Sequence, residues 1–433
     1  MSVPTMSVPT TREAWIAQGL GPEAAALVAR DAAAFFHQDG SSPCIGALRR
    51  AAGIWLEDME GRRCIDLHGN TVHHLGHAHP RLLAALHRQI DTLAFSPRRY
   101  TNEPATALAE ALLARWPGKP RRVLFATGGS DAIEIALRLA LVGTGARGIV
   151  SVQGSYHGHG FGAMGLSSAL YDPRLAMLAD RHHVAPYWDT AHGGAERMVE
   201  EIGLALATAP GGIAAVIAEP MRSNCHVPPA WLWPAVRVLC DRYGARLIFD
   251  EIPSGLGKTG RFFAFEHFGV HPDLVVLGKS LGGGLLPIAA VIADADLNVA
   301  PELNLGHYTH EKNPLTAAVA RETLAVIEDE GLVARAATLG AQAQALAAPL
   351  IAAGRLGGLR GMGLLLAAEL PDIPGTDRAA RARAAVFAGL RRGISSTTKP
   401  GGALGFSPPL IISDDELALA MAQMDAAFND GSA

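Results

Sequence analysis

The sequence has little lysine, few cysteines and no long apolar run. Only five of its 433 residues are lysine, and arginine supplies the other basic side chains. The four cysteines are widely spaced with no Cys-x-x-Cys pair, which argues against a disulfide framework or a zinc site and predicts reduced thiols in the cytoplasm. No uninterrupted apolar stretch reaches the ~18 residues that a membrane span needs, so none is predicted. The first residues also lack the basic and apolar segments of a secretory signal.

The charge balance excludes two classes of partner. Lys and Arg number 37 against 41 Asp and Glu, which gives a net charge of −4, so neither nucleic acid nor an anionic membrane surface is a predicted partner. Hydrophobic residues make up 49% of the chain and charged residues 18%, which is enough for a large core and excludes a disordered chain. Residues 1–5 are repeated as residues 6–10, and this repeat is left out of the fold prediction.

Buried parallel strands are the clearest structural signal. Three short runs are entirely apolar: Ile213–Ala218, Leu247–Phe249 and Leu274–Leu277. Such runs are typical of strands covered by helices on both faces, and helical patterns such as Pro234–Tyr243 lie between them, so the fold class is α/β. The runs are followed by Glu219, by Asp250 and, after one glycine, by Lys279. Ligands bind beyond the carboxyl ends of such strands, although each residue taken alone could be an ordinary surface group.

The domain organisation is predicted from the same patterns. Residues 1–70 form an N-terminal arm with a short hairpin and contribute to a small domain. Residues 71–315 form a large domain that holds the strands above. Residues 316–433, in which helical patterns flank the strand-like Gly363–Leu370, complete the small domain.

Lys279 and Asp250 together point to pyridoxal phosphate. A lysine at the end of a buried strand is costly unless it is paired or covalently bound, and a desolvated lysine becomes a nucleophilic amine. Pyridoxal phosphate needs a lysine that binds its aldehyde and a carboxylate that keeps its ring nitrogen protonated. The alternative is a buried salt bridge between the two side chains.

Two further segments fit the same cofactor. The sequence Thr127-Gly128-Gly129-Ser130-Asp131 directly precedes a predicted helix, and it could hold a phosphate on backbone N–H groups and a hydroxyl, although Ser or Asp there could also be only a helix cap. Tyr156-His157-Gly158 follows another predicted strand, and an aromatic ring there could stack on the cofactor. A metal site at His157 and His159 is disfavoured because no further ligands stand at a familiar spacing, so no metal is predicted.

These motifs, in this order, resemble the class III pyridoxal-phosphate aminotransferases of fold type I over about residues 45–425. The resembling stretches are Leu75–Pro80, Gly128–Ala132, Tyr156–Gly158, Ala218–Pro220, Asp250–Ile252, Gly257–Gly260, Gly278-Lys279, Gly282–Gly284 and Asn313-Pro314. The resemblance implies a large domain with a mostly parallel seven-stranded sheet between helices and a smaller α/β domain from both termini. It also implies a homodimer with sites at the subunit interface.

The resemblance assigns roles to residues. It implies Lys279, Asp250 and Glu219 as catalytic residues, with Lys279 bound to the cofactor and acting as acid and base. It implies a cofactor site made of Gly128, Gly129, Ser130, Tyr156, His157, Asp250, Ile252, Lys279 and Thr309. In this arrangement Thr309 binds the cofactor phosphate of the other subunit.

The sequence departs from a typical transaminase of the family in three respects. Many members carry a carboxylate-binding arginine shortly before a Pro-Pro-Leu segment, and Gly405 stands there, so the sequence predicts no such clamp and leaves Glu219 without that partner. Glu311 and Lys312 replace two glycines after Thr309. The segments Asn70–His77 and Ser96–Asn102 are similar to the phospho-lyases of the family.

The favoured function is therefore a lyase. Asn70, Arg98, Arg99 and Arg222 are the predicted binders of a phosphate or phosphonate on a small amine, although each could be only a solvated surface group. The pattern most resembles the branch that releases ammonia from 1-hydroxy-2-aminoethylphosphonate, with a histidine such as His68, His73 or His74 as general acid. An ω-amine or amino-acid transaminase is the alternative, and a cofactor-binding regulator without turnover is a third hypothesis.

Overall fold

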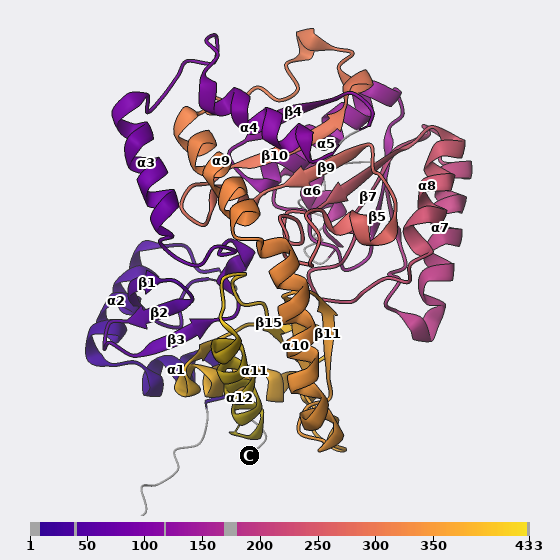
Figure 1. Cartoon of the computed structure of the whole chain (residues 1–433). Coiled ribbons are helices and arrows are strands. Elements are labelled where there is room, and N and C mark those ends of the chain that lie inside the picture. Colours follow the sequence, from indigo (N-terminus) through magenta and orange to yellow (C-terminus); the bar gives the residue numbers. More distant parts are fainter. Residues whose placement is uncertain (1–8, 39–40, 117, 169–179, 431–433) are drawn as a thin grey trace, which may run out of the picture. The chain divides into compact units, whose positions relative to one another are not determined.

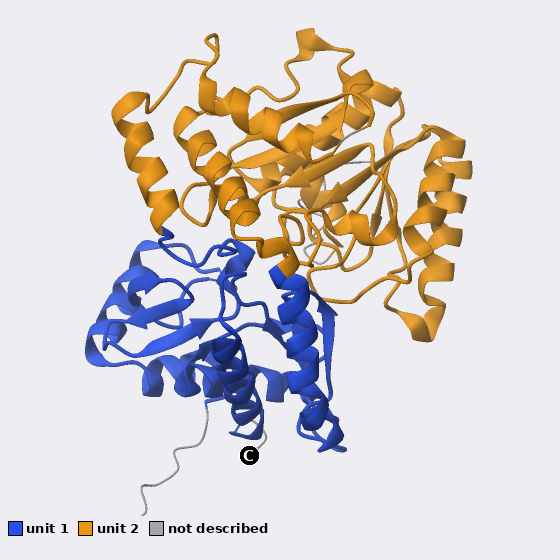
Figure 2. Ribbon diagram, viewed as in Figure 1, with its two compact units in different colours: residues 1–79, 335–433 blue, residues 80–334 orange. Residues whose placement is uncertain are grey.

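The computed structural model describes residues 9–38, 41–116, 118–168 and 180–430 (Figure 1). These residues form two compact units (Figure 2). Unit 1 contains the described residues up to His79 and those from Arg335 onward, and unit 2 contains Pro80–Ala334. Among the described residues, no helix is both long enough and apolar enough to cross a membrane.

Unit 2 is built on the predicted seven-stranded sheet. Its strands, in the spatial order of the sheet, are β4 (Arg121–Ala126), β10 (Ala289–Asp294), β9 (Leu274–Leu277), β8 (Arg246–Asp250), β7 (Ile213–Ala218), β5 (Gly148–Val152) and β6 (Arg181–Val184). The pairs from β9 to β6 are parallel, and β10 is antiparallel to both of its neighbours. The predicted fold class and its mostly parallel sheet are confirmed.

The central strands are buried because helices cover the sheet. Every residue of β5, β7 and β9 is buried, as the uninterrupted apolar runs predict. Helix α5 (Gly129–Thr144) packs against the sheet through its apolar face, and it ends at Gly145, whose φ of 71° suits a glycine. Its first turn lies beside the carboxyl ends of the strands, and this places Gly128–Ser130 there.

The remaining helices of unit 2 are α3 (Pro80–Thr92), α4 (Glu103–Ala114), α6 (Phe161–Leu166), α7 (Gly194–Thr208), α8 (Leu232–Tyr243) and α9 (Pro314–Asp329). Helices α7 and α8 pack side by side, and α3 and α4 pack against α9 (Figure 1). The Arg81 Nε donates to Glu322 Oε1 at 2.7 Å and joins α3 to α9.

Unit 1 contains two four-stranded sheets. One has the order β1 (Leu48–Ala52), β2 (Trp55–Asp58), β3 (Arg63–Asp66) and β13 (Ile394–Ser395), and the other has the order β11 (Gly358–Met362), β12 (Leu365–Glu369), β15 (Ala403–Phe406) and β14 (Thr398–Lys399). Its helices are α1 (Arg12–Gly19), α2 (Pro22–Ala34), α10 (Leu332–Ala352), α11 (Arg378–Arg392) and α12 (Asp414–Asp430); α10 begins in the last residues of unit 2. The predicted hairpin corresponds to β2 and β3.

The segment after β3 is held by Asp66. Its carboxylate accepts hydrogen bonds from the backbone N–H groups of His68 and Gly69, at 3.0 and 2.8 Å, and from His77 Nε2 at 2.9 Å. His73 is fully buried, and its Nε2 lies 3.1 Å from the main-chain oxygen of Asp66. His74 is buried as well, so neither histidine is a solvated surface group.

Candidate active site

Three polar side chains stand at the ends of three neighbouring strands. Ala218 pairs with Phe249 across β7 and β8, so Glu219 and Asp250 follow at the same level of the sheet. Asp250 pairs with Val276 of β9, and Lys279 lies three residues beyond Val276. Because adjacent strands lie only about 4.8 Å apart, the three residues meet at one edge of the sheet.

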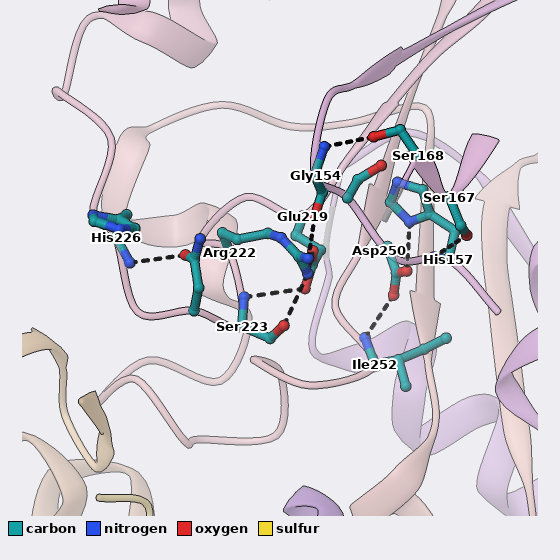
Figure 3. A network of polar contacts seen from close by, with 12 residues as sticks. Gly154, His157, Ser167, Ser168, Glu219, Arg222, Ser223, His226, Asp250 and Ile252 are labelled. Carbon is teal, nitrogen blue, oxygen red and sulfur yellow. Dashed lines mark hydrogen bonds and ion pairs between the residues drawn. The ribbon is translucent and has the colours of Figure 1, made fainter. Parts of the chain in front are cut away.

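Asp250 is buried and has two hydrogen-bond donors. Its side chain is 3% exposed, and its Oδ2 accepts a hydrogen bond from His157 Nδ1 at 2.8 Å (Figure 3). Its Oδ1 accepts from the backbone N–H of Ile252 at 3.1 Å. A carboxylate has about four acceptor positions, so this group retains the capacity to accept a hydrogen bond from a ligand.

Lys279 occupies an unusual backbone conformation. Its φ is 45°, in the left-handed region that residues other than glycine rarely adopt. It directly follows Gly278 and opens a short 3-10 helix, Lys279–Gly282, and its side chain is half-buried. Such backbone strain is concentrated at functional sites, where the surrounding structure holds it.

The first turn of α5 lies next to the Asp250 loop. A Cβ atom at Gly129 would lie 2.8 Å from Ile252 Cδ1, so glycine is needed for this close approach. Gly128 precedes the helix and offers no side-chain cap to its N–H groups. The Ser130 Oγ accepts a hydrogen bond from the His159 N–H at 3.1 Å and keeps its own proton to donate. This turn therefore presents N–H and O–H donors suited to a phosphate.

The loop from Gly154 to Gly160 connects these groups. His157 binds Asp250, His159 binds Ser130, and a Cβ at Gly158 would lie 2.4 Å from Ser130 Oγ. Tyr156 lies in the middle of this loop with 39% of its surface exposed. Burial raises the pKa of the Tyr156 hydroxyl, and the nearby negative charge of Asp250 raises it further.

Glu219 is paired with an arginine from its own loop. Arg222 Nη1 donates to Glu219 Oε2, and the Ser223 N–H donates to Glu219 Oε1 at 3.1 Å (Figure 3). Arg222 Nη2 donates to the carbonyl oxygen of Gly154. The absence of the family arginine at Gly405 therefore does not leave Glu219 without a charged partner, because Arg222, three residues later in the same loop, pairs with it.

The remaining predicted residues are all exposed. Arg98 and Arg99 are exposed in the segment between α3 and α4, and Thr309 is exposed before α9. Asn70 belongs to unit 1, where it is exposed with a φ of 46°. Within the described part of the chain, no group of three His, Cys, Asp or Glu side chains is placed to hold a metal ion.

Three contributors had no signal in the sequence. Gly154 contributes only its backbone, accepting from Arg222 and donating to Ser168 Oγ at 2.5 Å. Ser167 Oγ accepts from the His157 N–H at 2.7 Å, and Ser223 supplies the second donor to Glu219. Small polar residues and glycine in loops are too common for such contacts to be predicted from one sequence.

Comparison with known proteins decides the family. A family model described as aminotransferase class-III matches residues 36–428. The chain belongs to the class III aminotransferase family.

This chain is similar to family members that have different activities. It is 36% identical to the (R)-1-hydroxy-2-aminoethylphosphonate ammonia-lyase of Vibrio splendidus (strain 12B01), over 96% of this chain and 92% of that protein. It is 35% identical to the acetylornithine aminotransferase of Mycobacterium tuberculosis (strain ATCC 25618 / H37Rv), over 86% and 88% of the two chains. The omega transaminase from Pseudomonas jessenii in complex with PMP is structurally similar, with a TM-score of 0.86, 27% identity, and 94% and 98% of the chains covered.

This class III aminotransferase-family protein is therefore a pyridoxal-phosphate-dependent enzyme. The residues of unit 2 fit that cofactor. The buried Asp250 carboxylate suits a protonated ring nitrogen, and the uncapped first turn of α5 suits a phosphate. The half-buried Lys279 supplies the only kind of side chain that binds the cofactor aldehyde as an imine.

Proposed function

We propose that this enzyme is an ammonia-lyase that acts on a small hydroxy-amine bearing a phosphonate, such as (R)-1-hydroxy-2-aminoethylphosphonate. The observation that carries the proposal is Gly405. It lies on β15 opposite Ala367, where the family resemblance places the carboxylate-binding arginine of many transaminases. Glycine cannot bind a carboxylate with two parallel hydrogen bonds. The similarity to the lyase of Vibrio splendidus, which covers 96% of this chain, supports the same function.

Each proposed site residue has a separate task. Pyridoxal phosphate, when bound, supplies an acceptor for the electrons left by loss of a proton. Asp250, oriented by His157, holds the proton on the ring nitrogen. Tyr156 stacks on the ring, and Gly128, Gly129 and Ser130 bind the phosphate. Ile252 donates its N–H to Asp250 and limits the space behind Gly129.

Lys279 moves the proton that starts the reaction. Its amine, once replaced by the amine of the substrate, removes a proton from the carbon that bears nitrogen. The hydroxyl on the adjacent carbon then leaves with a proton as water. Hydrolysis of the released enamine consumes one water and gives phosphonoacetaldehyde and ammonia, so the net reaction neither gains nor loses water.

The phosphonate needs a cationic partner. Arg98 and Arg99 stay predictions for this role, as does Asn70 for substrate contact; both arginines are exposed. Arg222 is already bound to Glu219 and Gly154, and its role is argued separately below. We also propose a homodimer in which Thr309 binds the cofactor phosphate of the other subunit; the exposure of Thr309 supports this arrangement.

Ammonia release without a keto acid tests the function. The purified holoenzyme is incubated with (R)-1-hydroxy-2-aminoethylphosphonate alone, and we expect stoichiometric ammonia and phosphonoacetaldehyde. Lys279→Ala should abolish both the ammonia and the borohydride-fixed cofactor label at position 279. Lys119→Ala is the matched control, because Lys119 is 74% exposed and its Nζ lies 3.6 Å from Asp294 Oδ2 at the end of β10.

Transamination is the alternative, and the likeness to the Pseudomonas jessenii omega transaminase favours it. That function predicts that an amine converts the bound cofactor to its pyridoxamine form and that pyruvate then accepts the amino group. Efficient transfer to pyruvate with no ammonia from the phosphonate would overturn the lyase proposal. Absence of any borohydride label at position 279 in the wild type would overturn the cofactor assignment as well.

A further inference from the structure

Arg222 binds three groups at the edge of the unit 2 sheet. Its Nη1 donates to Glu219 Oε2 and, at 2.9 Å, to Ser223 Oγ, while its Nη2 donates to the Gly154 carbonyl oxygen (Figure 3). The side chain is only 11% exposed and that of Glu219 only 2%. The guanidinium therefore connects the end of β7, where Glu219 stands, with the segment that follows β5.

The backbone of Arg222 is also fixed. Its N–H donates to the hydroxyl oxygen of Tyr187 at 3.2 Å, and that hydroxyl donates to the carbonyl oxygen of His226 at 2.7 Å. Tyr187 is 4% exposed. Next to it, Trp233 Nε1 donates to the carbonyl oxygen of Pro220 at 2.8 Å. Hydrogen bonds to buried aromatic side chains thus hold the loop that carries Arg222 in place. Arg222 can therefore fix the position of the loop that contains Gly154.

The segment that Arg222 holds is the one that carries Tyr156. At the far end of this segment, the His159 N–H donates to Ser130 Oγ, and in the middle His157 binds Asp250 and Ser167. At the near end, Gly154 is held through its N–H by Ser168 and through its carbonyl oxygen by Arg222. Tyr156 lies only two residues beyond Gly154.

We propose that Arg222 is a positioning residue: it fixes the Tyr156 loop by joining the Gly154 carbonyl to the Glu219 carboxylate. The proposal rests on the proposed function, in which Tyr156 stacks on the cofactor ring. Glu219 holds the guanidinium in place and balances its charge. A buried arginine without a carboxylate would be costly, so the two residues act as one unit.

This role differs from binding the phosphonate of the substrate. Three N–H groups of the Arg222 guanidinium already donate to protein oxygens, and the side chain is only 11% exposed, so an anion would have to bind beside these partners or displace them. The Glu219 carboxylate would also repel that anion at close range. The contacts therefore favour a structural connection over an anion-binding group, and the two roles predict different kinetics.

The test compares two substrates that differ only in the phosphonate. Ethanolamine has the carbon skeleton of (R)-1-hydroxy-2-aminoethylphosphonate without the phosphonate group. Arg222→Gln cannot span Glu219 and Gly154, so we expect kcat to fall about 10–100-fold with both amines, as for other small misplacements at active sites. We also expect weaker visible circular dichroism of the bound cofactor before any amine is added. Arg222→Lys, which reaches one partner but not both, should give an intermediate change.

Arg237→Gln is the matched control. Arg237 is 17% exposed and pairs with Asp241 and Asp273 at the opposite edge of the same sheet, so its loss removes a comparable ion pair away from the cofactor. It should lower thermal stability and leave the circular dichroism of the cofactor unchanged. If Arg222→Gln does not fold, Glu219→Gln combined with Arg222→Gln leaves no unpaired charge and should show the same loss of signal.

Two results would overturn the proposal. A rise in KM for the phosphonate alone, with unchanged kcat for ethanolamine and an unchanged cofactor signal, would show that Arg222 binds the substrate anion. Wild-type behaviour of Arg222→Gln in every measurement would show that the connection has no role. Both of these results concern Arg222 variants. Failure of the proposed function would instead appear in the wild-type enzyme as absence of ammonia.

Discussion

His157 is a buried residue that forms a hydrogen bond with Asp250 in the proposed cofactor site. It is 2% exposed, and its Nδ1 lies 2.8 Å from Asp250 Oδ2, so it must donate to that carboxylate. The Ile252 N–H binds Oδ1 of Asp250 and His157 binds Oδ2. Together the two hydrogen bonds fix the rotamer of Asp250. We therefore expect His157 to affect cofactor binding through Asp250.

His157→Phe should therefore weaken binding of the cofactor. Hydrogen bonds to charged groups contribute about 1.5–3 kcal/mol, so the dissociation constant should rise about 10–100-fold. Titration of the apoenzyme with pyridoxal phosphate, followed by visible absorbance, measures the change. His182→Ala is the control, because His182 forms a similar pair with Asp180 at 3.0 Å but is 32% exposed on β6. Equal affinity of His157→Phe and wild type would contradict this role.

At the scale of elements, sequence patterns located the strands well. The runs Ile213–Ala218 and Leu274–Leu277 coincide with β7 and β9, and Leu247–Phe249 lies within β8. They were predictable because a strand buried on both faces has no polar position to interrupt its pattern. The polar residue that follows each run marks the edge of the sheet, and this located Glu219, Asp250 and Lys279.

Contacts made by loops could not be predicted in the same way. The pairing of Arg222 with Glu219 and Gly154 depends on the path of two loops, and no periodicity records that path. The prediction of Arg222 as a substrate binder rests on its residue type and on its position just after Glu219-Pro220, and neither reveals that its guanidinium has protein partners. His73 and His74 are buried, although polar side chains usually lie at the surface, and the sequence pattern alone does not predict this.

The segment after β3 gives a prediction about pH. Burial by itself would raise the pKa of Asp66, but the hydrogen bond from His77, the charge of His73 and two backbone N–H groups together lower it to about 2. Because the pKa is lower in the folded state than the usual 3.8, the stabilisation is present above about pH 4 and is lost as the pH falls through 2.

Asp66→Asn should remove this stabilisation. The free energy of unfolding at pH 6 should be about 2 kcal/mol lower than in the wild type, and the difference should shrink below pH 4. Urea unfolding between pH 2 and 6 measures it. Asp189→Asn is the control, because Asp189 pairs with His192 at the surface and should change stability little at any pH. A difference that does not depend on pH would show that the charge of Asp66 is not involved.

At the scale of the whole molecule, the proposed cofactor residues are all in one unit. Gly128–Ser130, Tyr156, Asp250 and Lys279 lie in unit 2, on four different segments of chain. A bound cofactor would therefore contact all four segments. Without it, these segments are held together mainly by the strands that precede them. Of the residues proposed to decide substrate preference, Gly405 and Asn70 lie in unit 1, whereas Arg98 and Arg99 lie in unit 2. The proposed cofactor residues, in contrast, come from unit 2 alone.

Cofactor binding should accordingly stabilise unit 2 in preference to unit 1. A ligand at 100 times its dissociation constant contributes about 2.7 kcal/mol to the stability of the state that binds it. Hydrogen exchange of holoenzyme and apoenzyme should show slower exchange at the first turn of α5, in the Gly154–Gly160 loop and at Lys279–Gly282. Strands β11 and β12 of unit 1 should exchange at equal rates in the two forms. Equal slowing in both units would contradict this expectation, because it would show that the units open together as one cooperative block.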